Sequence, residues 1–148
     1  MTADSPSQTT HTGGCLCGAV RYEFDGPTKW IGYCHCQSCR RNTGALFAAF
    51  VGLPREQFRY VKGAPARFES SPRTWRSFCG RCGSPIIYEA DRWAGEVHVN
   101  MGTLDAPQDF QPTFHVHVAE QVPWLHIADD LPRYAASGAG AQPLPRRP

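Results

Sequence analysis

The sequence predicts a single all-β domain built of short antiparallel strands. Apolar and polar residues alternate with a period of two in several short segments, as in strands that bury one face. Fourteen glycines and thirteen prolines interrupt a chain of 148 residues, and no segment of a dozen residues has helical apolar spacing. Seven cysteines in three close clusters are typical of metal ligands or reactive thiols.

The expected strands follow one another along the chain with turn residues between them. In the first strand, apolar side chains alternate with Arg21 and Glu23, and Lys62-Gly63 is a turn signal after the third strand. Residues 37–42 are the one segment that predicts a short turn of helix. The strands are expected at residues 20–24, 46–51, 58–61, 73–78, 85–89, 97–101 and 114–118.

Both ends of the chain differ in composition from the predicted domain at residues 13–134. Residues 1–12 are polar without periodicity, and residues 135–148 are rich in Ala, Gly and Pro, so both are expected to be disordered tails. The N-terminal segment has neither a basic start nor an apolar stretch, which argues against a secretory signal. A cytoplasmic location, where thiols stay reduced, is therefore expected.

Charge and hydropathy exclude two classes of partner. Fifteen basic and thirteen acidic residues give a net charge of +2, without the clustered basic face of a nucleic-acid-binding domain. The longest apolar stretch, residues 45–51, is far shorter than the roughly 20 residues of a membrane span. The predicted partner is thus neither nucleic acid nor membrane.

The first and third cysteine clusters together predict a structural zinc site. Cys79 and Cys82 form a zinc knuckle, in which glycines let the backbone curl its amides toward the sulfurs. A structural zinc needs four ligands, and Cys15 and Cys17, also flanked by glycines, are the candidates for the other two. The alternative is that some of these cysteines are merely buried.

The middle cluster predicts a second, catalytic zinc site. Cys34, Cys36 and Cys39 supply three ligands, and three protein ligands with an open fourth position are typical of catalytic zinc. Zinc with three thiolates has a net charge of −1, which disfavours ionising water but suits a soft fourth ligand. A substrate thiol is therefore the expected occupant of the open position.

Two other interpretations of the middle cluster remain open. His35 could be the fourth ligand, although an extended chain would point its side chain away from Cys34 and Cys36. The cluster could also bind no metal. An iron–sulfur site is disfavoured because the cluster lacks a fourth cysteine.

Other polar residues are candidates for substrate binding and proton transfer. Arg40 and Arg41 could hold substrate carboxylates beside the cysteines, or be ordinary surface charges. His115 and His117 are expected to share one strand face, where they could bind metal, move protons or form structural hydrogen bonds.

These motifs resemble one known family, named after the glutathione-dependent formaldehyde-activating enzyme, which also includes centromere protein V. The resemblance spans residues 13–134 and keeps all seven cysteines in register. The segments that carry it are 13–22 (GGCLCGAVRY), 34–41 (CHCQSCRR), 78–85 (FCGRCGSP), 123–125 (PWL) and 130–134 (DLPRY).

The resemblance implies a zinc-bound β-tent fold with two zinc ions. In the family, the positions of Cys15, Cys17, Cys79 and Cys82 hold a structural zinc, and those of Cys34, Cys36 and Cys39 hold a catalytic one. The prototype joins glutathione and formaldehyde to S-hydroxymethylglutathione and is classed as a carbon–sulfur lyase. The resemblance therefore implies a small thiol such as glutathione as partner.

Three functions compete. The first is a zinc-dependent lyase for thiol–aldehyde adducts, with His35 or His115 moving the proton. The second is a non-catalytic docking module, which the near-neutral charge disfavours because binding a polyanion needs many basic residues. The third, methionine-sulfoxide reduction, uses a free nucleophilic cysteine, whereas all seven cysteines here are assigned to zinc.

Overall fold

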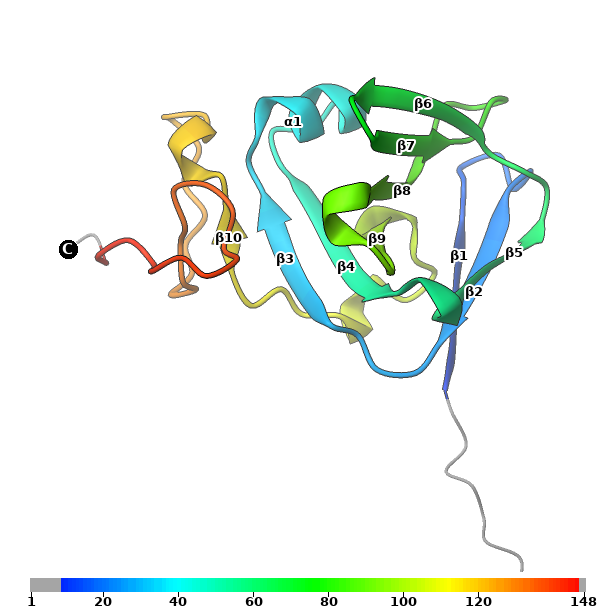
Figure 1. Cartoon of the computed structure of the whole chain (residues 1–148), viewed down its shortest axis with the longest axis horizontal. Coiled ribbons are helices and arrows are strands. Elements are labelled where there is room, and N and C mark those ends of the chain that lie inside the picture. Colours follow the sequence, from blue (N-terminus) through cyan, green and yellow to red (C-terminus); the bar gives the residue numbers. More distant parts are fainter. Residues whose placement is uncertain (1–8, 147–148) are drawn as a thin grey trace, which may run out of the picture.

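The computed structural model describes residues 9–146, and strands dominate this part of the chain. A three-stranded sheet has the order β1-β2-β5, and a seven-stranded sheet has the order β10-β3-β4-β9-β8-β7-β6 (Figure 1). This arrangement confirms the predicted all-β fold. The strands are β1 (Thr10–Gly14), β2 (Arg21–Asp25), β3 (Trp30–Cys34), β4 (Ala48–Pro54), β5 (Phe58–Lys62), β6 (Ala66–Ser71), β7 (Thr74–Phe78), β8 (Pro85–Ala90), β9 (Glu96–Asn100) and β10 (His115–Val116).

The main core lies where the two sheets face each other. The predicted alternation is confirmed in β2, where Tyr22 and Phe24 are fully buried while their neighbours are only half-buried. They belong to one apolar cluster with β4 and β9, to which Leu53 and Val97 contribute fully buried side chains. Burial of this apolar surface holds the small sheet against the large one.

One pair of strands departs from the predicted antiparallel pattern. β10 runs parallel to β3, with His115 opposite Tyr33 and Val116 opposite Cys34. A parallel partner must return from a distant part of the chain, which local alternation does not reveal. This pairing brings the segment after residue 114 beside the middle cysteine cluster (Figure 1).

The predicted turn of helix at residues 37–42 is confirmed as α1 (Gln37–Thr43). Cys36 is its N-cap and accepts a hydrogen bond from the Cys39 backbone N–H through its Sγ, at 3.3 Å. Gly44 ends the helix with a left-handed φ of 68°. Among residues 9–146, no helix has the length and apolarity needed to cross a bilayer.

Short 3₁₀ turns connect several strands, and two of these turns carry side chains that line a cavity. Residues Asp91–Trp93 form one of them between β8 and β9, and Val118–Glu120 form another after β10. The remaining three are Arg55–Gln57, Met101–Thr103 and Pro107–Asp109.

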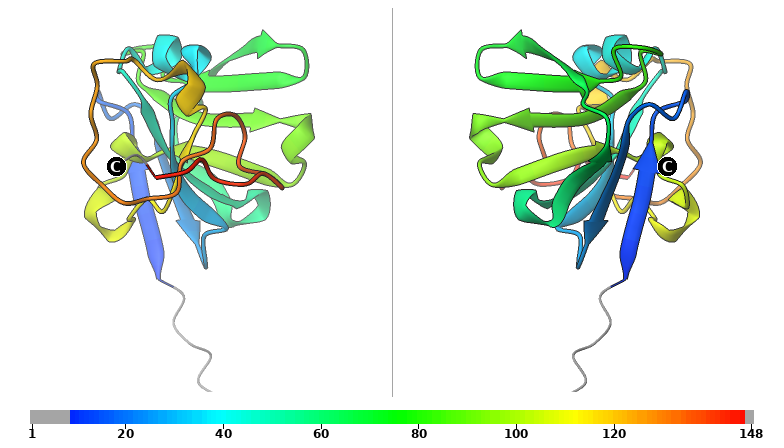
Figure 2. Two further views of the ribbon diagram at one scale, coloured as in Figure 1. Left: turned by 90° about the vertical axis from the view of Figure 1, so that its left-hand side faces the viewer. Right: turned by 90° about the vertical axis from the view of Figure 1, so that its right-hand side faces the viewer.

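Parts of both segments predicted as disordered tails are paired with the domain. β1 begins at Thr10, within the expected tail 1–12, because its backbone pairs with β2 from Thr10 to Gly14. The described part of the expected tail 135–148 also packs on the domain, since Ala136 O accepts from His117 N at 3.0 Å and Leu144 N donates to Arg133 O at 2.7 Å. This last segment lies beside β10 (Figures 1 and 2). Residues 1–8 and 147–148 lie outside the described residues.

Candidate functional site

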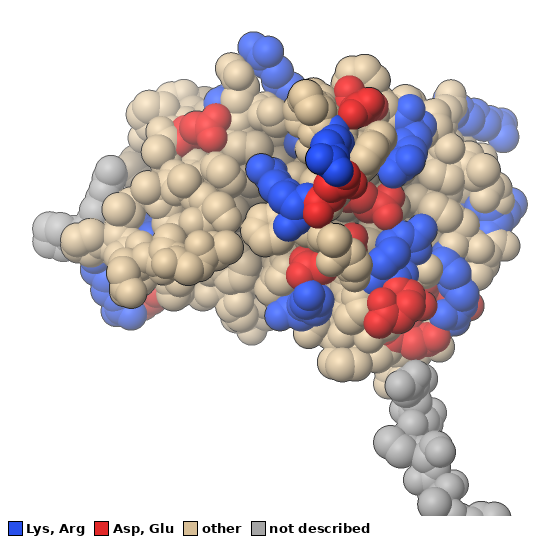
Figure 3. All heavy atoms as spheres, viewed as in Figure 1, with Lys and Arg blue, Asp and Glu red and all other residues tan. Residues whose placement is uncertain are grey.

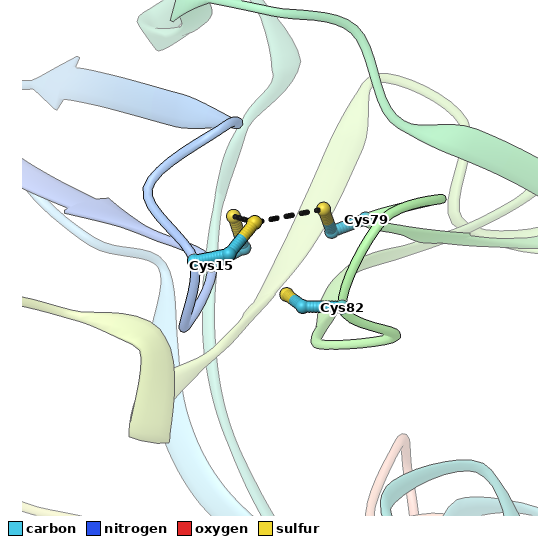
Figure 4. A group of neighbouring side chains, drawn as sticks. Cys15, Cys79 and Cys82 are labelled. Atoms are coloured by element: carbon cyan, nitrogen blue, oxygen red, sulfur yellow. Dashed lines mark hydrogen bonds between the residues drawn. The ribbon is translucent and has the colours of Figure 1, made fainter.

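The four cysteines predicted to bind a structural metal converge between the two sheets. Cys15 and Cys17 lie in the loop after β1, and Cys79 and Cys82 lie in the turn between β7 and β8. Figure 4 shows Cys15 facing the Cys79 and Cys82 turn. All four sulfurs lie within 4.8 Å of one another.

The geometry of this four-cysteine cluster fits tetrahedral zinc. Bonds of about 2.3 Å place neighbouring sulfurs about 3.8 Å apart in a tetrahedron. Here the Sγ atoms of Cys15 and Cys17 are 3.6 Å apart, and those of Cys17 and Cys79 are 3.8 Å apart. The Ser84 hydroxyl, 3.2 Å from the Cys82 Sγ, lowers the pKa of Cys82 to about 5, which favours the thiolate that a metal requires.

The middle cysteines form a second cluster, at the junction of β3 and α1. The sulfurs of Cys34, Cys36 and Cys39 lie within 4.8 Å of one another. Cys34 and Cys39 are buried, and Cys36 is half-buried. Hydrogen bonds from the two buried thiols lower the pKa of Cys36 far below the ordinary thiol value. The cluster therefore offers three soft ligand atoms of the kind that zinc accepts.

A buried arginine contacts this three-cysteine cluster. The Nη1 and Nη2 atoms of Arg76 lie 3.8 and 3.9 Å from the Cys39 Sγ. The guanidinium also lies over the ring of Tyr88, with Cζ 5.0 Å from the centroid, and Nε donates to the Ser70 hydroxyl at 3.1 Å. Among the ion pairs of residues 9–146, none joins Arg76 to a carboxylate. The cysteine cluster is thus its nearest source of negative charge.

The three-cysteine cluster opens into a cavity of about 850 Å³. All three cysteines line this cavity, whereas none of the four-cysteine cluster does. Arg76, Arg92, His98, His117 and Glu120 provide its charged and titratable side chains. A ligand in this cavity would therefore meet three thiols and two guanidinium groups.

His35 and His115, both fully buried, form a hydrogen-bonded pair away from the cavity lining. His35 Nε2 lies 2.9 Å from His115 Nδ1, and His115 Nε2 lies 2.9 Å from a carboxylate oxygen of Asp129. Burial lowers the pKa of both histidines, that of His35 to about 4, so both are neutral at neutral pH. Because the carboxylate accepts from His115 Nε2–H, His115 Nδ1 accepts from His35 Nε2–H.

The expectation that His115 and His117 share a strand face is wrong. β10 ends at Val116, and His117 has a left-handed backbone with φ 56° and ψ 35°. The chain turns there, so His115 packs against His35 while His117 lines the cavity. His117 Nδ1 lies 3.6 Å from a carboxylate oxygen of Glu120.

Arg40 and Arg41 do not line the cavity. Both lie on α1, where Arg40 is half-buried and Arg41 is exposed. Two other arginines take the place that the sequence predicted for Arg40 and Arg41. Arg76 lies beside the cysteines, and Arg92 lies in the cavity wall. The sequence predicts a strand at residues 73–78 but gives no sign that Arg76 is buried and reaches Cys39.

His98 is a further cavity residue that the sequence did not identify. It lies on β9 and its ring packs between Tyr88, at 5.2 Å, and Trp30, at 4.5 Å between ring centroids. Its Nε2–H donates to the Glu96 carboxylate at 3.1 Å. Burial lowers the pKa of His98 to about 4, against the opposing effect of Glu96.

Acid is expected to destabilise the fold through His98. Its folded-state pKa lies below the unfolded value, so the unfolded state binds more protons between about pH 6.5 and 4 and stability falls as the pH falls. We expect the wild type to lose about 1–2 kcal/mol more unfolding free energy than His98→Gln between pH 7 and pH 5. Urea unfolding of both proteins, with metal content recorded, measures this difference. Equal losses of unfolding free energy in the two proteins would contradict the assignment of this pH dependence to His98.

Charges of both signs are interspersed on the surface. On the face drawn in Figure 3, basic and acidic side chains alternate. Within residues 9–146, Arg59 pairs with Glu23 and Asp25, and Arg55 pairs with Glu89. This pattern differs from the uniform basic face that nucleic-acid binding requires.

Comparison with known proteins agrees with this geometry. Residues 10–120 match the family described as glutathione-dependent formaldehyde-activating enzyme. A Halomonas elongata protein that is provisionally named a glutathione-dependent formaldehyde-activating enzyme is 28% identical over 125 residues, covering 78% of this chain and 79% of its own. A crystal structure of a Rhodobacter sphaeroides protein superposes with a TM-score of 0.56 and 27% identity, covering 66% of this chain and 93% of that one.

Proposed function

The chain belongs to the glutathione-dependent formaldehyde-activating enzyme family, and from that premise we propose that it is a zinc-dependent carbon–sulfur lyase for adducts of small thiols and aldehydes. The observation that carries the proposal is the difference between the two cysteine clusters. One has four sulfurs and no opening to the cavity, and the other has three sulfurs that line it. A closed four-ligand site is typical of structural zinc, and an open three-ligand site is typical of catalytic zinc.

In this proposal the metal ligands divide into a structural and a catalytic set. Cys15, Cys17, Cys79 and Cys82 hold the structural zinc, and Cys34, Cys36 and Cys39 hold the catalytic zinc. When bound by the three cysteines, zinc favours the ionised form of a substrate thiol. Since all seven cysteines are free thiols in the structure, the proposal includes a reducing compartment such as the cytoplasm.

Arg76 offsets the negative charge of the catalytic cluster. Three thiolates outweigh one divalent cation, and a substrate thiolate adds a further negative charge. The guanidinium 3.8 Å from Cys39 Sγ is buried, so its field is only weakly screened by solvent. Arg92 is exposed at the cavity wall, where Tyr88 OH accepts a hydrogen bond from its Nη2 at 2.7 Å. It is the candidate for a substrate carboxylate, in place of Arg40 and Arg41.

The histidines take different roles in the reaction. His117 lines the cavity and accepts the proton of the substrate thiol. The thiolate then attacks the aldehyde carbon, so that a carbon–sulfur bond forms as the carbonyl π bond breaks. The resulting alkoxide oxygen takes back the proton held by His117 to give the adduct. The reverse sequence breaks the same bond. His35 and His115 do not contact the cavity and hold the Cys34–Cys36 segment in place through their mutual hydrogen bond.

Glutathione is expected to perturb the three-cysteine cluster. With cobalt in place of zinc, a thiol that binds there changes the charge-transfer absorption, while the four-cysteine cluster has no free position and does not respond. Optical titration of the cobalt protein with glutathione measures this, with Cys39→Ser as the matched control that loses the response. Absence of a spectral change with every thiol tested would contradict the lyase proposal and favour a docking module.

A further inference from the structure

The cavity beside the three cysteines has a continuous aromatic wall. The ring of Trp30 lies 6.0 Å from Phe114 and 4.5 Å from His98, which in turn stacks on Tyr88 at 5.2 Å. The wall extends at one end to Tyr134, 6.4 Å from Phe114, and at the other to Phe50 and Trp93. We define the aromatic wall as the side chains of Trp30, Phe50, Tyr88, Trp93, Phe114 and Tyr134, all of which line the cavity.

The volume of the cavity exceeds what a one-carbon aldehyde occupies. Cavities of about 300–1,000 Å³ typically enclose drug-sized molecules, and this one measures about 850 Å³. A hydroxymethyl group attached to a thiol would contact the three cysteines and leave most of the aromatic wall exposed to water. Burying that wall against an apolar ligand is favourable, since the free energy gained scales with the apolar area removed from water.

The polar groups that border this wall already have partners. Arg76 lies over the Tyr88 ring and against Cys39, and the Nε2–H of His98 is engaged by Glu96. Arg92 donates to the Tyr88 hydroxyl and lies 5.8 Å from the centroid of the Trp93 ring, so two cations border the aromatic surface. A ligand that places an apolar ring on the wall therefore leaves none of these groups without its observed partner.

We propose that the substrate of this site is a thiol adduct that carries an aromatic or similarly bulky apolar group. The inference rests on the proposed function and names its substrate class. The sulfur lies at the three cysteines, and the apolar group packs on the end of the aromatic wall that Phe50, Tyr88 and Trp93 form beside them. Selectivity then depends on the wall, whose side chains pack beside the three cysteines but are not themselves metal ligands.

A matched pair of thiols tests this substrate class. 2-Phenylethanethiol and 2-mercaptoethanol differ only in a phenyl ring in place of a hydroxyl group. Titration of the cobalt-substituted full chain is expected to give an affinity at least about ten-fold higher for the phenyl compound, because its ring packs on the aromatic wall. Saturation-transfer NMR with 2-phenylethanol, the oxygen analogue, is expected to show contact between the ring and the protein without any bond to the metal.

Two tryptophan variants distinguish the loss of ring packing in the aromatic wall from the general effect of replacing a tryptophan. Trp93→Leu is expected to reduce the ten-fold preference several-fold, through a lower affinity for the phenyl compound. Trp75→Leu is the matched control, because Trp75 stacks against Arg67, at 4.6 Å from the ring centroid, outside this cavity. The control is expected to retain the full preference.

The outcomes distinguish this inference from the proposed function. Equal affinities for the two thiols, with no NMR contact from 2-phenylethanol, would overturn the inference while thiol entry at the cysteines stands. An equal loss of preference in Trp75→Leu and Trp93→Leu would also overturn it. If neither thiol changes the cobalt spectrum, the proposed function fails and the substrate class fails with it.

Discussion

Cys79→Ser is expected to abolish the folded state. The substitution removes one ligand of the four-cysteine cluster, which joins the loop after β1 to the turn between β7 and β8. Cys79 is 2% exposed, and its sulfur meets that of Cys17 across 62 residues of chain. Structural zinc contributes roughly 10–16 kcal/mol to folding in small zinc domains, which is comparable to the whole stability of a domain. Far-UV circular dichroism and zinc content of the purified variant measure the loss.

A control in the same cluster separates ligand loss from a general loop effect. Leu16 lies between two of the ligands with its side chain 90% exposed, so Leu16→Ser is expected to keep both fold and zinc content. A folded Cys79→Ser protein whose melting temperature stays within a few degrees of the wild type would show that this cluster is not structural.

Cys39→Ser is expected to leave a folded protein with one zinc fewer per chain and no response to thiols. Cys34, Cys36 and Cys39 lie within six residues, so a metal bound there closes almost no loop. It therefore removes little entropy from the unfolded chain and adds little to the stability of the fold. A modest destabilisation is expected because Arg76 loses its nearest negative partner. Zinc per chain, melting temperature and the cobalt titration with glutathione measure the three effects.

The neighbouring residue provides the control for this second variant. Ser38→Ala changes an exposed side chain in the same turn of α1 and is expected to retain both metals and the thiol response. Equal destabilisation by Cys79→Ser and Cys39→Ser would contradict the division into structural and catalytic clusters.

The cysteine clusters could be predicted because short spacing along the chain becomes short distance in space. C-x-C and C-x-x-C segments bring their sulfurs together in whatever fold contains them, and glycines beside Cys15 and Cys82 leave room for the turns. The alternation in β2 likewise predicted the burial of Tyr22 and Phe24. Both signals depend on residues that are close in sequence. The first and third cysteine pairs were joined only because a structural zinc needs four ligands.

The cavity could not be predicted because its residues come from separate strands. Arg76 on β7 meets Cys39 across 37 residues, and outside the cavity lining His35 meets His115 across 80. A single sequence shows which residues share a face of one strand, but it does not show which strands become neighbours. The parallel pairing of β10 with β3 is such a long-range contact. Arg40 and Arg41 lie on α1 directly after Cys39, but neither lines the cavity.

The parallel pairing of β10 with β3 also bears on the order in which the site is completed during synthesis. Because a chain is made from its N-terminus, Cys34, Cys36 and Cys39 leave the ribosome long before Phe114 and Gly138, which form the far side of the cavity. Until the later residues are made, the three thiols lack the part of the cavity lining that follows residue 113 in the complete chain. The three thiols are therefore open to solvent on that side in the nascent chain, and the complete chain narrows this access.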